Sequence, residues 1–240
     1  MTERRELPHW LQHWWLWFAL LFAITFAIFW PSFFSAITNV DLPIVIHGLS
    51  ATGWMLLTVF QALMIRSRKR KAHHLIGYSS LILAIVLVAS ALVMEREMIL
   101  RDGTDTLGEP LLSLKFFYND IGALVLFCLF LGLAILAARR RDIPMHLRYI
   151  ACTAFMPLVP ALERAFLALD LTPDWTSALH ASLATLAGVT AVITFVEWRY
   201  RRLRWPFPGL FGYYLLMYLT TDLYASTAFA EQFAFGFAGR

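Results

Sequence analysis

Cysteine and charge are both scarce in this chain of 240 residues. Its two cysteines, Cys128 and Cys152, lie inside apolar segments and form no C-x-x-C pair, which excludes a disulfide framework, an iron–sulfur site and covalent C-x-x-C-H haem attachment. Charged residues make up 15% of the chain, against roughly 25% in soluble domains. Hydrophobic residues make up 60%, and the mean hydropathy is +0.64. The composition therefore predicts an integral membrane protein in contact with a lipid bilayer.

Apolar segments long enough to cross a bilayer fill most of the chain. Seven can be drawn, at roughly 12–34, 44–65, 75–95, 114–138, 147–169, 175–197 and 208–229. Basic clusters follow the second, fourth and sixth segments, whereas the turns on the other side are mainly acidic. The positive-inside rule then predicts an all-α bundle of seven transmembrane helices with the N-terminus in the cytoplasm and the C-terminus outside. We expect residues 1–240 to form a single integral membrane domain, in a bacterial inner membrane.

Further absences exclude whole classes of function. The last segment contains no lysine, so a retinal Schiff base is excluded. The net charge of +4 lies mostly in short loops between segments, where it sets orientation and does not indicate a nucleic-acid partner. The middle of the predicted bilayer carries no ionisable side chain, which argues against a transporter with a substrate site on broken helices at that depth.

Polar residues occur at matching positions in three segments. His47, Asp120 and His180 are each followed by an arginine nineteen positions later. Nineteen helical residues rise about 28 Å, close to the roughly 30 Å hydrocarbon core of a bilayer. We therefore expect the three side chains at one depth near the outer face. His73 and His146, which come twenty-six positions after His47 and Asp120, are expected near the inner face.

The ionisable residues within the segments form the predicted outer layer. Away from the extreme segment ends they are His47, Asp120, Glu163, Arg164, His180 and Asp222. Each costs on the order of 3 kcal/mol or more in hydrocarbon, so such residues usually face the bundle interior in pairs. Histidine and carboxylate side chains from several helices can bind copper, zinc or iron. Five of the six are therefore candidate metal ligands: His47, Asp120, Glu163, His180 and Asp222. The alternative is a structural network in which Arg164 forms an ion pair with Glu163 or Asp120.

The two inner histidines each begin an outward-running segment directly after a basic turn. Matching positions on two helices of the same orientation favour His73 and His146 as shared ligands of one cofactor. The alternative is that both are interfacial side chains. The neighbouring His74 is expected at the interface, where a basic residue would extend towards water.

The sequences around these histidines resemble known families. His73-His-Leu-Ile-Gly-Tyr and His146-Leu-Arg-Tyr-Ile resemble the H-R-x-x-G and H-R-x-W/L-M elements of uncharacterised bacterial multispan membrane families, which include an assembly factor for haem–copper cytochrome oxidase. Arg164, after Pro160-Ala-Leu-Glu, matches an arginine near the end of the same helix in those families. The chain departs from the pattern where His74 and Leu147 replace arginine. The resemblance covers roughly residues 44–169 and implies an accessory or assembly role in a respiratory or other membrane complex.

A looser resemblance is to transmembrane di-haem cytochromes b of the ascorbate-reducing type. In those proteins four successive helices begin with a histidine, and alternate helices share a haem. The resemblance implies His73 and His146 as ligands of an inner b-type haem. Asp120 stands where the outer pair needs a histidine, and His180 is a candidate substitute to pair with His47.

Two main functions are consistent with the sequence. The first is an integral membrane redox or cofactor-binding protein that holds b-type haem between paired histidines for electron transfer. The second is a non-enzymatic metal-binding or assembly subunit with an outer site of histidines and carboxylates. A hydrolase that uses zinc-activated water with Glu163 as general base is a third possibility, although no nucleophile stands out. The sequence leaves open whether the protein is an enzyme.

Overall fold

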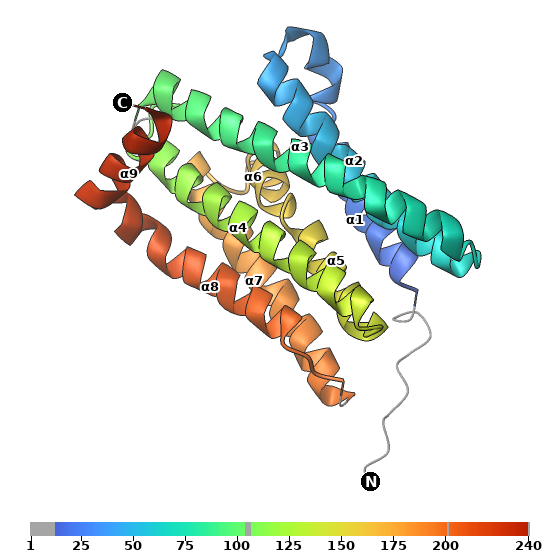
Figure 1. The fold of residues 1–240 in the computed structure, drawn as a ribbon. Coiled ribbons are helices and arrows are strands. Elements are labelled where there is room, and N and C mark those ends of the chain that lie inside the picture. Colours follow the sequence, from blue (N-terminus) through green and yellow to red (C-terminus); the bar gives the residue numbers. More distant parts are fainter. Residues whose placement is uncertain (1–12, 104–106, 201, 240) are drawn as a thin grey trace. The chain divides into compact units, whose positions relative to one another are not determined.

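A computed structural model describes residues 13–103, 107–200 and 202–239 of the chain. The described residues form helices and no extended strand, so the predicted all-α class is confirmed (Figure 1). Among them, five helical stretches are long and apolar enough to cross a membrane: Leu42–Arg66, Arg70–Arg101, Leu112–Arg139, Ile143–Ala168 and Trp175–Arg199. A helix satisfies its backbone hydrogen bonds internally, which hydrocarbon requires because it has no water to offer. These helices indicate a protein of the lipid bilayer.

The chain divides into two compact units, Trp10–Glu97 and Met98–Arg240, and the boundary falls within a helix. The first unit contains α1 (Trp14–Phe29), the short 3₁₀ helix η2 (Phe34–Asn39), α2 (Leu42–Arg66) and most of α3 (Arg70–Asp102). Helix α1 packs on α2, and α2 meets α3 where Gly53 faces Leu83. At 16 residues, α1 is shorter than the roughly 20 that a perpendicular span needs.

The second unit contains six helices. They are α4 (Leu112–Arg139), α5 (Ile143–Phe155), α6 (Leu158–Ala168), α7 (Trp175–Arg199), α8 (Pro206–Ala225) and α9 (Ala228–Ala238). Helix α8 packs against both α4 and α7, while α5 packs on α4 and α6 on α7 (Figure 1). Large side chains from α4, α7 and α8, including Phe130, Leu183 and Tyr214, are almost fully buried.

The helices follow the predicted segments with four differences. The first helix ends at Phe29, whereas the first segment was drawn to residue 34. The fifth segment is interrupted, because Pro157 has no N–H and its ring clashes with the preceding turn. The seventh ends at Ala225, and a separate helix begins after Thr227, whose hydroxyl accepts from the N–H of Ala230. Helix α3 continues to Asp102, well into the expected outer turn. The count of seven spans stays a prediction. The predicted cytoplasmic N-terminus falls on residues 1–12, which lie outside the described part of the chain.

Candidate functional site

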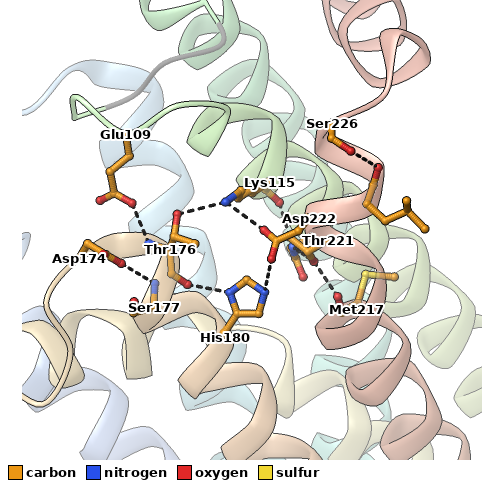
Figure 2. Close-up of polar contacts among 12 residues, drawn as sticks. Glu109, Lys115, Asp174, Thr176, Ser177, His180, Met217, Thr221, Asp222 and Ser226 are labelled. Atoms are coloured by element: carbon orange, nitrogen blue, oxygen red, sulfur yellow. Dashed lines mark hydrogen bonds and ion pairs between the residues drawn. The ribbon is translucent and has the colours of Figure 1, made fainter.

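A ring of polar contacts joins three helices of the second unit where α7 begins (Figure 2). Lys115 Nζ lies 2.9 Å from Asp222 Oδ1 and 3.4 Å from Thr176 Oγ1. His180 Nε2 lies 3.2 Å from Asp222 Oδ2, and His180 Nδ1 lies 2.9 Å from the carbonyl oxygen of Thr176. We call Lys115, Thr176, His180 and Asp222 the Lys115 cluster. It connects α4, α7 and α8.

The first turn of α7 holds this ring in place. The first N–H groups of a helix have no partner within the helix, and carboxylates satisfy them here. Glu109 accepts from the backbone N–H groups of Trp175 and Thr176 at 2.8 and 2.9 Å. Asp174 accepts from the N–H of Ser177 at 2.7 Å, and this hydrogen bonding holds the pKa of Asp174 below its usual value. Thr176 is thereby fixed one turn before His180, on the same face of the helix.

The Lys115 cluster presents one accessible carboxylate. The Asp222 side chain is 61% exposed, against 13% for Lys115 and 21% for His180. Both ring nitrogens of His180 face oxygen atoms, Nδ1 the Thr176 carbonyl and Nε2 the Asp222 carboxylate. The Lys115 ammonium and the His180 ring thus converge on Asp222. No group of three or more histidine, cysteine, aspartate or glutamate side chains gathers as a metal site among the residues that the structure describes.

A second polar group lies deeper in the same unit. Glu163 on α6 is only 5% exposed, and Asp120 and Arg164 both lie within electrostatic reach of it. Arg164 Nη1 donates to the carbonyl of Pro160 at 2.8 Å, and its guanidinium lies 5.8 Å from the centre of the Trp175 ring. Arg164 thus lies near the carboxylates of both Glu163 and Asp120. The ion pair of Arg164 with one of them, in a structural network, stays a prediction.

The inner histidines are held by neighbouring helices of their own units. His146 Nδ1 lies 2.9 Å from the carbonyl oxygen of Ala134 on α4. In the first unit, the amide nitrogen of Gln61 on α2 donates to His73 Nδ1. In this orientation of the amide, the Gln61 oxygen accepts from the N–H of Gly77 at 3.1 Å. His74 is exposed. Both candidate ligands thus have Nδ1 against a partner on an adjacent helix, in opposite roles: the Ala134 carbonyl accepts from His146, whereas the Gln61 amide donates to His73.

His47 occupies a half-buried position on α2 of the first unit. Its imidazole is hydrogen-bonded to the backbone of Leu87 on α3. Its Nδ1 atom is buried, and no described residue gives it a hydrogen-bond partner. The ring is therefore oriented by α3.

The structure brings together part of the predicted outer layer. His180 and Asp222 are in contact, and Asp120 lies near Glu163. His47 and His73 belong to the first unit, and His146 and His180 belong to the second. The pairing of His73 with His146 and of His47 with His180 stays a prediction from the sequence.

Several polar residues that the structure brings into contact were not predicted from the sequence. Lys115 lies one residue inside the predicted fourth segment and was not among the candidates. At the opposite end of α7, Arg148 Nε lies 2.6 Å from Glu197 Oε1, and the two side chains are 11% and 9% exposed. Glu197 Oε2 also accepts from the N–H of Arg204. A search for opposite charges one turn inside the segment ends would have found these residues.

The chain has no match among protein-family models, curated proteins or solved structures. The resemblances to the multispan families and to the di-haem cytochromes b therefore rest on the short motifs around His73 and His146.

Proposed function

We propose that this chain is an integral membrane redox protein that binds b-type haem through His146, with seven spans and a cytoplasmic N-terminus in a bacterial inner membrane. The observation that carries the proposal is the 2.9 Å hydrogen bond between His146 Nδ1 and the carbonyl oxygen of Ala134. A carbonyl oxygen only accepts, so Nδ1 carries the ring proton, and Nε2 is then the nitrogen of the neutral ring that can bind a metal. Proteins orient metal-binding histidines in this way.

The second axial ligand in this proposal is His73, and His47 with His180 are the candidates for a second haem. The Gln61 amide donates to His73 Nδ1, so His73 would bind iron through Nε2 only after its ring proton leaves that nitrogen. These roles come from the spacing and from the resemblance to the di-haem cytochromes b. Two histidine ligands fill both axial positions of haem iron, which favours electron transfer over oxygen binding. The basic residues just before His73 and His146 would attract haem propionates.

Substitution of the inner histidines tests this function. We expect His146→Ala and His73→Ala to lower the haem content of the purified protein at least roughly tenfold and to abolish the reduced α-band. His74→Ala is the matched control, because His74 is adjacent in sequence but exposed, and it should keep haem content and spectrum. Unchanged haem content in His146→Ala would contradict the proposal.

A second candidate function is a metal-binding or assembly subunit of a respiratory or other membrane complex. The contact between His180 and the exposed Asp222 carboxylate favours it, because imidazole and carboxylate together suit zinc, copper or iron. In the structure the Lys115 ammonium lies 2.9 Å from the same carboxylate. A metal ion at Asp222 would have to displace this ammonium group.

Lys115 therefore provides a test of the metal site. We expect Lys115→Met to tighten zinc binding by roughly tenfold or more, since the competing cation is removed while His180 and Asp222 remain. Lys115→Arg keeps the positive charge and should bind zinc as weakly as the native chain. The measurement is a zinc titration of the purified variants. Binding to Lys115→Met that survives a further His180→Ala substitution, or no binding at all, would contradict the metal site.

A further inference from the structure

Helix α9 is attached to the second unit by one of its faces. Successive residues of a helix are about 100° apart around its axis, so residues four apart lie on the same face. Ala230, Ala234 and Ala238 share such a face and are fully buried. They pack in a core that includes Leu114 and Phe117, both near the start of α4. This contact holds α9 against the end of the unit where α4 begins (Figure 1).

A second face of α9 carries two exposed phenylalanines. Phe229 and Phe233 are 65% and 47% exposed, and they lie one turn apart. Their rings stack at a centroid distance of 5.9 Å, with 10° between the two planes. The centroid of the Phe233 ring also lies 5.8 Å from that of the buried Phe117. The two rings are therefore held together on the surface, and exposed apolar patches mark contact with a membrane or with another protein.

The other side of α9 carries a charge. Glu231 comes two residues after Phe229, which places it about 200° further around the helix axis. Its side chain is exposed. The buried alanine face lies between these two directions, so the phenylalanines and the carboxylate flank it on opposite sides. A helix with an apolar stripe opposite a charged side is the form that lies in the plane of a membrane–water interface.

The neighbouring charges place α9 at the edge of the membrane. Lys115 directly follows Leu114, and its ammonium lies 2.9 Å from the Asp222 carboxylate, which is 61% exposed. An exposed charge is costly in hydrocarbon, so this level of the unit reaches the lipid headgroups. On α8, Leu219 and Leu223 are 64% and 68% exposed. An exposed apolar surface therefore runs along α8 towards α9 and ends at the depth where acyl chains give way to headgroups.

We propose that α9 lies along the membrane–water interface and inserts Phe229 and Phe233 among the acyl chains of the surrounding lipids, with Glu231 in water. Aromatic side chains bury about 150–250 Å² each, so the two rings offer at most about 500 Å². A stable protein interface buries about 800 Å² on each partner. The two rings are therefore too small a surface to hold a second copy of the chain, but they suffice to anchor a helix in lipid. The proposal is independent of haem and metal binding.

Nitroxide labels on the full chain in phosphatidylcholine vesicles test this position. The labels are attached at Phe229→Cys and, as the matched control on the opposite flank of α9, at Glu231→Cys. Both variants carry Cys128→Ser, since Cys128 is exposed and Cys152 is buried. Oxygen is concentrated among acyl chains and a nickel chelate is confined to water, so their collision rates with the label report its surroundings. We expect the ratio of oxygen to nickel collisions at residue 229 to exceed that at residue 231 by roughly fivefold or more, because an interfacial helix buries its apolar face about 5–10 Å deep.

A low ratio at both positions, with nickel reaching residue 229 freely, would overturn the proposal by placing both flanks of α9 in water. Low collision rates with both reagents at residue 229 would overturn it as well, because a second copy or another protein would then cover the rings. Phe233→Cys repeats the test with Phe229 in place, in case the first substitution disturbs α9. A high ratio there supports the interfacial helix, and a ratio equal to that at residue 231 contradicts it.

Discussion

Glu197→Ala is expected to lower the free energy of unfolding by about 3–5 kcal/mol. The substitution leaves the Arg148 guanidinium in a largely buried position without its carboxylate partner, which lies 2.6 Å away in the native chain. Among the described residues, Arg148 would retain the backbone carbonyls of Pro144 and Arg202 as acceptors, at 2.9 and 3.4 Å. The N–H of Arg204 would also lose its acceptor. Reversible denaturation of the purified protein in mixed micelles measures the change.

Two controls separate the ion pair from a general effect of substitution. The double variant Arg148→Met with Glu197→Leu removes both charges, and it should cost much less than Glu197→Ala alone. Arg96→Ala breaks an ion pair whose side chains are 48% and 57% exposed, and it should cost less than about 1 kcal/mol. A Glu197→Ala variant within about 1 kcal/mol of the native chain would show that the pair does not hold α5 to α7.

Gly48→Ala is expected to destabilise the first unit by about 1–3 kcal/mol. A Cβ atom at Gly48 would overlap the ring of Phe33, which is itself buried at 7% exposure. Either the Phe33 ring or helix α2 must move to admit the methyl group. The same denaturation measurement applies.

Gly53→Ala is the matched control on the same helix. A Cβ atom there would meet Leu83 Cδ2 at 3.5 Å, which is an ordinary contact. Because alanine is a better helix former than glycine by up to about 1 kcal/mol, Gly53→Ala should be neutral or stabilising. Equal effects of the two substitutions would contradict the close approach of Phe33 to α2.

Hydropathy predicts most of the helices because a span averages the apolar character of about 20 residues. The segments at 44–65, 114–138 and 175–197 match α2, α4 and α7 to within three residues at each end. Averaging also hides local interruptions. Pro157 signals the end of α5 in the sequence, but its apolar neighbours keep the hydropathy of the whole stretch high. Helix α9 was missed because its 11 residues are too few to be recognised as a membrane span.

Spacing predicts depth but not lateral neighbours. It placed His180 and Asp222 at one level, and the structure has them 3.2 Å apart. It could not indicate that Lys115 shares the Asp222 carboxylate, since that contact depends on which face of α4 meets α8. Contacts between residues about a hundred positions apart require the packing of whole helices.

Absorption spectra of the detergent-purified native protein, oxidised and then reduced with dithionite, test the proposed redox function most directly. We expect a Soret peak that shifts on reduction and a sharp reduced α-band, as bis-histidine b-type haem gives. A spectrum without haem bands, from protein produced with ample haem, would contradict haem binding through His146. The second function, a metal site at His180 and Asp222, would then be the one to pursue.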